Sequence, residues 1–445
     1  MDKSAASNRR TRRLLDREIF TLAVPTFATL VSEPLLLLAD AAIIGHLGTV
    51  ELAGLGVAAN VLGILTGLCV FLAYGTTSTV ARRLGAGDRT AALSGGVDGL
   101  VLAALLGIVL ALTLEALLPT VVGAYGASAG VSAAATTYLR IAALSLPSIL
   151  LLLAGTGVLR GLQDTKTPLF VVVGANVANI GLDLALVYGL RLGIAGSALG
   201  TLIAQTGAAV VVVALVVRGA RRAQAAPRFR LRGVLTAARA GVWLVARTAT
   251  LQAAVTLTTV VAVSGGVVVM AAHQVLSALW TLLAFALDAI AIAGQAIIGR
   301  ALGAGQIQLG RAMCRRMLGW GVGCGLLFGG LLWLSRPVFL PLFSPDPAVQ
   351  QLVGRVALVL AIVTPLAGVV YVLDGVLIGA GDGRYLAVAG LVALAAYCPL
   401  ALGVRELGAG LAWLWVANGG FMLARMLTLL VRLRSNAWVR VGGEL

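Results

Sequence analysis

The sequence predicts an all-α polytopic membrane protein with twelve transmembrane helices in two six-helix lobes. We expect the lobes to be parallel repeats related by pseudo-two-fold symmetry. Three observations predict this fold class: an apolar composition, a series of long apolar runs and an internal repeat. The 445 residues are 60% hydrophobic and 11% charged, with a mean hydropathy of +1.02. A soluble fold does not bury so large an apolar fraction, and a β-barrel would show short alternating strands instead.

The apolar runs are long enough for helices that cross a bilayer, which takes about 20 residues each. The 56 glycines favour close contacts between such helices. Charged segments and helix breakers divide the chain into twelve spans. These are about 19–45, 52–80, 91–118, 131–159, 167–190, 193–217, 234–263, 267–299, 312–335, 347–378, 385–403 and 407–431.

The basic residues predict the orientation of the spans. Of the 33 Lys and Arg residues, 26 lie on the side that holds both termini, whereas the opposite loops hold only Arg191, Arg336 and Arg405. Cytoplasmic loops are enriched in Lys and Arg, so we expect cytoplasmic termini in a bacterial-type inner membrane. The net charge of +16 follows from this topology and from attraction to anionic lipid. The basic runs lie where this rule expects them, so we expect no nucleic-acid partner.

The two halves of the chain repeat each other at a shift of 218 residues. At this shift LGAG 84–87 matches LGAG 302–305, and GVLRGLQDTK 157–166 matches GVLIGAGDGR 375–384. A constant shift at separated places indicates a duplication. Six spans per repeat is an even number, so both halves enter the membrane in the same direction. We expect an N-terminal lobe at 1–217, a basic cytoplasmic linker at 218–233 and a C-terminal lobe at 234–445.

One predicted span, the fifth, carries a polar stripe. Asn176, Asn179 and Asp183 are three, four and seven residues apart, which places them on one helix face. Asp40 lies in the first span, and odd spans run the same way, so Asp40 and Asp183 fall in the same half of the membrane, away from the cytoplasm. Acidic groups at this depth are costly and are usually functional.

Two carboxyl groups close together in an apolar medium cannot both stay charged. The pair can therefore share a proton, or bind a sodium ion through the oxygens of Asp40, Asn179 and Asp183. Asn176 and Asn179 could also serve only as hydrogen bonds between helices. At the 218-residue shift Asp183 matches Ala401, so we expect the acid pair in the N-terminal lobe alone.

Further polar groups could line a cavity or form a second coupling site. Glu33 shares a face with Asp40 and either lines the same cavity or reaches water. Asp374 either takes part in coupling or makes a buried hydrogen bond between helices. The pair His273–Gln274 either relays protons or caps and packs a helix. The remaining candidates are Gln252 and Asp288.

Two prolines interrupt the first span. Pro25 and Pro34 each remove a backbone hydrogen bond and crowd the preceding turn, which weakens the helix locally. They either act as hinges or fit a static packing.

Motifs along the whole chain carry a family resemblance. They are LAVPTFATLVSEPLLLLADAAIIGHLG in the first span, RRLGAGD after the second, VLRGLQDTKTP after the fourth, NVANIGLD in the fifth and YVLDGVLIGAGD in the tenth. In order and spacing they resemble the multidrug and toxic compound extrusion (MATE) transporters, and within these the DinF branch. The resemblance implies a cation-coupled efflux transporter with alternating access. It also implies that Asp40 and Asp183 are the coupling acids, that Asn179 assists them and that Pro25 is a bending point.

The sequence therefore predicts a cation-coupled antiporter that exports amphipathic, cationic organic compounds in exchange for H⁺ or Na⁺. We expect a monomer with no cofactor besides the transported ion, and no use of ATP because GxxxxGK[ST] is absent. One alternative is a lipid-linked glycan flippase, which would favour basic cavity residues. Against it, Arg140, Arg247, Arg355 and Arg425 are expected near span ends. The other is an intramembrane enzyme, for which no catalytic motif is found.

Overall fold

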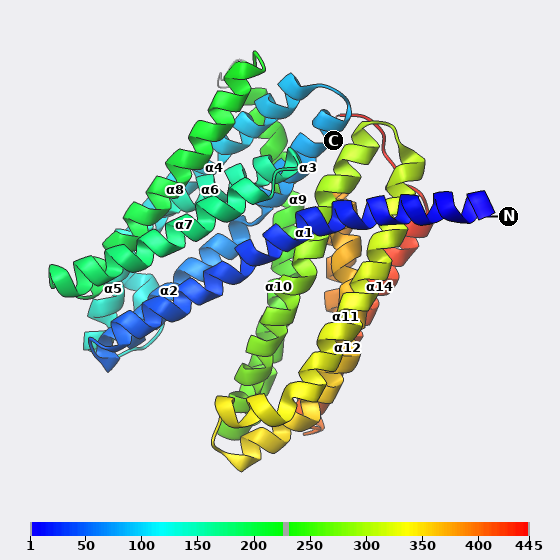
Figure 1. Cartoon of the computed structure of the whole chain (residues 1–445). Coiled ribbons are helices and arrows are strands. Elements are labelled where there is room, and N and C mark those ends of the chain that lie inside the picture. Colours follow the sequence, from blue (N-terminus) through cyan, green and yellow to red (C-terminus); the bar gives the residue numbers. More distant parts are fainter. Residues whose placement is uncertain (1, 226–230, 444–445) are drawn as a thin grey trace. The chain divides into compact units, whose positions relative to one another are not determined.

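The computed structural model describes residues 2–225 and 231–443, and throughout this part of the chain the regular structure is helical (Figure 1). Residues 226–230 of the predicted linker lie outside the described residues. The elements are α1 Asp2–Gly45, α2 Thr49–Cys69, α3 Phe71–Gly85, α4 Arg89–Gly123, α5 Ala129–Ala143, α6 Leu146–Gly161, α7 Lys166–Asp183, the π-helix η1 Leu184–Gly189, α8 Ile194–Arg222, α9 Leu231–Ser264, α10 Val267–Gly303, α11 Ile307–Phe343, α12 Pro347–Gly379, α13 Gly383–Glu406 and α14 Leu411–Arg434.

These helices are long and apolar enough to form the predicted membrane spans. Eleven stretches of the described chain are each long and apolar enough to cross a membrane. In this count α2 and α3 form one stretch, and α7 and η1 form another. The pair α5 and α6, bent by 52°, makes a twelfth if it is one span. Pro147 lies in the first turn of α6, where its missing N–H costs no helical bond. The all-α, twelve-span class is therefore confirmed.

The internal repeat is visible in the way helices pack. A side chain at Gly107 would lie 2.8 Å from Pro147 N, and one at Gly325 would lie 2.9 Å from Pro365 N. These two contacts are related by the 218-residue shift. Both need a glycine because the backbones of two helices touch there. The duplication has thus kept its helix contacts as well as its motifs.

By internal packing the chain divides into two units, of residues 28–241 and of residues 1–27 with 242–443. The boundaries cross α1 between Phe27 and Ala28, and α9 between Gly241 and Val242. The predicted lobes 1–217 and 234–445 remain a prediction, since these units share α1 and α9 between them.

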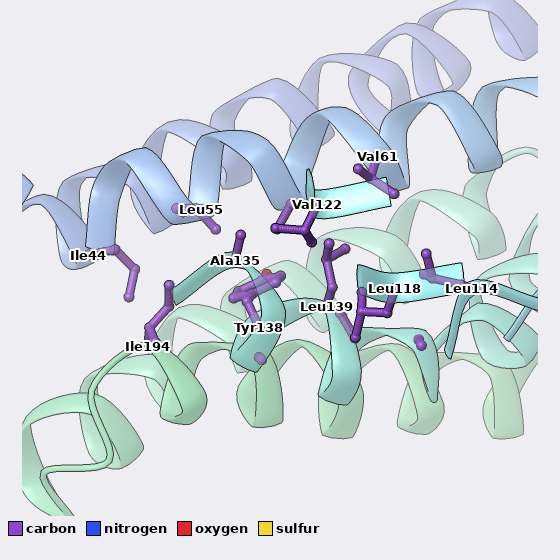
Figure 2. Packing of buried hydrophobic residues seen from close by; sticks show 14 of the residues in the cluster. Ile44, Leu55, Val61, Leu114, Leu118, Val122, Ala135, Tyr138, Leu139 and Ile194 are labelled. Atoms are coloured by element: carbon purple, nitrogen blue, oxygen red, sulfur yellow. The ribbon is translucent and has the colours of Figure 1, made fainter. Parts of the chain in front are cut away.

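An apolar cluster of buried side chains lies inside the unit of residues 28–241 (Figure 2). It joins Ile44 of α1, Leu55 of α2, Tyr138 of α5 and Ile194 of α8, none of which is more than 9% exposed. Aliphatic side chains around Tyr138 exclude water from its ring. The cluster thereby holds a phenol hydroxyl beside the polar group described next.

Candidate functional site

Asp40, Asn179 and Asp183 come together inside the unit of residues 28–241. They are 5%, 2% and 0% exposed. Asp40 lies five residues before the end of α1, and the other two lie in the last turns of α7. The carboxyl groups of Asp40 and Asp183 are close enough to interact directly with each other. A hydrogen bond between two carboxyl groups requires that one of them holds a proton.

The side-chain amide of Asn179 links this acid pair to α8. In the orientation that satisfies both ends of the amide, Nδ2 donates to Asp40 Oδ1 over 3.2 Å. Its oxygen then accepts from Thr201 Oγ1 at 3.2 Å and from Thr201 N at 3.0 Å. Asn179 is therefore part of the site and is more than a bond between α7 and α8.

Three hydroxyl residues complete the site, and the sequence reading missed all of them. Ser197 Oγ donates to Asp183 Oδ2 over 3.1 Å, and Tyr138 Oη lies 3.5 Å from Thr201 Oγ1. Ser197 and Thr201 are four residues apart on α8, so they share a face. That spacing was a usable signal, although hydroxyl residues in membrane helices often serve only to join helices.

Within the described part of the chain, no cationic side chain pairs with the acids Asp40 and Asp183. No group of three or more His, Cys, Asp or Glu residues in the described chain could hold a metal ion. A sodium ion would thus have to combine the two carboxylates with amide and hydroxyl oxygens. The arrangement can bind a proton or a small cation, because either would compensate the two buried acids.

Asn176 and Glu33 lie outside this cluster. Asn176 Nδ2 donates to the backbone oxygen of Ser32 over 3.0 Å, which ties α7 to α1. Glu33 is on α1 two turns before Asp40, and its side chain is exposed. Pro25 and Pro34 are both contained in α1, which continues as helix through each of them.

Asp374, in the other unit, has two cationic partners. Its Oδ2 accepts from Arg247 Nη2 over 2.6 Å and also from Arg425 Nη2. Asp374 on α12 is 3% exposed, Arg247 on α9 is 8% exposed and Arg425 on α14 is 6% exposed. Arg247 and Arg425 are therefore buried and paired with Asp374, which lies five residues before the end of α12. A carboxylate on another helix offsets the cost of burying them.

The remaining candidates also belong to the unit that includes residues 242–443. His273 Nε2 lies 3.3 Å from Thr259 Oγ1, and its ring packs against Trp415. Gln252 and Gln274 are exposed. Asp288 is half-buried and lies within electrostatic range of Tyr371.

Comparison with known proteins establishes the family. The MatE family profile matches residues 25–185 and 245–402, more than half of the chain. This chain belongs to the MatE family. It is a membrane transporter of the multidrug and toxic compound extrusion type, acts on small organic substrates within a membrane, and is not an enzyme.

Individual relatives cover nearly the whole MatE chain. DNA damage-inducible protein F of Escherichia coli K12 is 32% identical over 427 residues, which cover 93% of this chain and 91% of that protein. DETOXIFICATION 44, chloroplastic, of Arabidopsis thaliana is 30% identical over 435 residues, or 95% of this chain and 83% of that protein. A crystal structure of the Vibrio cholerae MATE transporter VcmN is 23% identical, with a TM-score of 0.88 over 97% of this chain and 99% of that one. The family resemblance and the two-lobe fold are thus confirmed.

Proposed function

We propose that this MatE transporter is a cation-coupled antiporter in which Asp40 and Asp183 bind the coupling ion, H⁺ or Na⁺. The observation that carries the proposal is the acid pair itself. Two carboxyl groups, each at most 5% exposed, lie close together, and no ion pair among the described residues supplies them with a cation. Such a pair stays buried only with a bound proton or cation. An ion that enters from one side and leaves to the other can therefore be exchanged there.

The exported compounds are amphipathic organic cations under this proposal. A positively charged substrate is favoured near the two acids and competes with the coupling ion for the same charge. Exchange of one for the other is antiport, and it needs no ATP. A single chain contains both acids and all their partners, so the transporter acts as a monomer. The side that holds both termini carries 26 of the 33 Lys and Arg residues. This supports a location in the inner membrane with both termini in the cytoplasm.

A lipid-linked glycan flippase is supported less well. Its distinguishing feature would be basic cavity residues, and Arg247 and Arg425 are indeed buried inside the protein. However, both guanidinium groups bind Asp374. Their charge is already engaged by the protein, whereas the charge of the acid pair is not.

The test is transport into inside-out vesicles with the pH gradient and the sodium gradient imposed separately. Uptake of an organic cation dye should follow one gradient or both, and should not change when ATP is added. Uptake that ignores both gradients, or that ATP alone accelerates, would overturn the proposal.

A further inference from the structure

The first repeat is one residue longer than the second at a defined place. Backbone positions with positive φ mark the ends of the corresponding segments. Gln163 and Gly381 are 218 residues apart, whereas Gly193 and Gly410 are 217 apart. Arg191 and Gly408 are also 217 apart. One additional residue therefore lies between Gln163 and Arg191, within α7 and η1.

The π-helix η1 accommodates this residue. It follows Asp183 directly and spans Leu184–Gly189. Leu190 N donates to Ala185 O over 2.9 Å, a bond across five residues that is typical of a π-turn. The corresponding helix of the second repeat, α13, is α-helical from Gly383 to Glu406. A π-turn is a one-residue insertion into an α-helix, and such turns are frequent at functional sites.

Two glycines of α8 leave space for the Asp183 carboxyl and for the π-turn. A side chain at Gly196 would lie 2.9 Å from the backbone carbon of Leu186. A side chain at Gly200 would collide with Asp183 Oδ1, a buried oxygen that accepts no hydrogen bond. At the shift of 217 that holds after the π-turn, their counterparts are Trp413 and Ala417.

The fold itself does not require these features. The second repeat makes the same helix–turn–helix connection with one residue fewer, without a π-turn and without the glycines. It also has Ala401 where the first repeat has Asp183 at the 218-residue shift. The insertion, the two glycines and the acid thus occur together in one repeat and are all missing from the other.

We propose that η1, Gly196 and Gly200 are positioning elements that place the Asp183 carboxyl for binding of the coupling ion. The wider π-turn brings the backbone of residues 186 and 187 against Gly196, and Gly200 leaves room for Asp183 Oδ1. Asp183 then meets Ser197 Oγ at 3.1 Å and the Asp40 carboxyl. The titratable groups facing this acid are Asp40 of α1 and Tyr138 of α5. This inference rests on the proposed ion-binding role of the acid pair.

The first test compares Gly200→Ala with Gly207→Ala on the same helix. An added methyl group meets Asp183 at position 200 and nothing within 4 Å at position 207. The readout is the H⁺ or Na⁺ concentration that displaces half of a bound organic cation dye from purified transporter. We expect at least a ten-fold change for Gly200→Ala, none for Gly207→Ala, and similar thermal unfolding for both. Equal displacement by the two variants would overturn the inference.

The second test removes the insertion. Deletion of Ala185 gives the first repeat the length of the second, which folds without a π-turn, so the variant should still fold. It should lose the ion dependence of dye binding. Insertion of one alanine after Leu402 in α13 is the matched control and should keep it. A deletion variant with the wild-type response would show that η1 does not position the acid; if the deletion fails to fold, the Gly200→Ala comparison decides.

The wild-type protein separates this inference from the proposed function. If dye binding by the wild type does not depend on H⁺ or Na⁺, the coupling role of the acids fails, and the positioning role fails with it. If the wild type responds and Gly200→Ala responds equally, only the positioning role fails.

Discussion

The charges of buried acids are compensated differently in the two units. Asp374 is held by two arginines, whereas the described polar partners of Asp40 and Asp183 are an amide and a hydroxyl group. A buried charge that a side chain of the protein neutralises can serve the structure alone. A buried charge without such a partner must be neutralised by a bound proton or cation. This contrast is the reason why we propose ion exchange at the acid pair and not at Asp374.

Removing either acid of the pair should abolish coupling. We expect Asp40→Asn and Asp183→Asn each to stop gradient-driven dye efflux, with normal membrane insertion, because Asn keeps the shape and removes the charge. The double variant should be little worse than either single one, since the two groups bind one ion as a unit. Efflux assays in vesicles check this, and robust efflux by either single variant would contradict it.

Removing the carboxylate of Asp374 should cost stability instead of coupling. Asp374→Asn leaves Arg247 and Arg425 buried without their partner, which we expect to destabilise the protein by roughly 3–5 kcal/mol. The unfolding midpoint in detergent should fall while dye binding keeps its dependence on H⁺ or Na⁺. Combining Asp374→Leu with Arg247→Met and Arg425→Met should restore much of the midpoint. Normal stability with lost ion dependence would instead make Asp374 a coupling residue.

At the scale of elements, α1 is held at both ends by contacts in different units. Near its start, Asp16 accepts from Arg316 at 2.5 and 2.6 Å and from Trp320 Nε1 at 2.8 Å. Near its end, Tyr188 Oη donates to Ile43 O over 2.6 Å. Pro25 lies between these anchors, two residues before the boundary of the units. α1 therefore belongs to both units, and we expect Pro25 to weaken it near their boundary.

Restoring the missing backbone donor should therefore stiffen α1 at Pro25. We expect Pro25→Ala to slow dye transport several-fold while ion-dependent dye binding stays unchanged. Pro34→Ala, which lies wholly within the part of α1 that packs with residues 28–241, should have a smaller effect. Transport rates in proteoliposomes compare the two, and a Pro25→Ala variant as fast as the wild type would exclude α1 as the moving part.

The elements also show the limit of sequence reasoning. Asp40, Asn179 and Asp183 were predictable because acids and amides are rare in apolar helices and their spacing defines a face. Tyr138, Ser197 and Thr201 were not, since hydroxyl residues are common in such helices. The π-turn was hidden as well: a constant shift of 218 residues conceals the single residue by which the repeats differ after Asp183.

At the scale of the whole molecule, composition and the repeat were sufficient for the fold class. Apolar length predicts the spans, and an even number of spans per repeat predicts their parallel direction. The burial of Arg247 and Arg425 could not be predicted from the sequence for a physical reason. An arginine inside an apolar helix is costly by itself. The carboxylate that offsets this cost lies on another helix, 127 residues from Arg247 and 51 from Arg425 in sequence, so the pairing appears only in three dimensions.

We propose that the coupling ion occupies the acid pair and leaves when the organic cation binds. Ion release from purified transporter on addition of the dye measures this directly, as acidification of a weakly buffered solution or as loss of bound radioactive sodium. The wild type and Gly207→Ala should release the ion in proportion to the dye bound, and Asp183→Asn should release none. Release from Asp183→Asn equal to that from the wild type would contradict the claim.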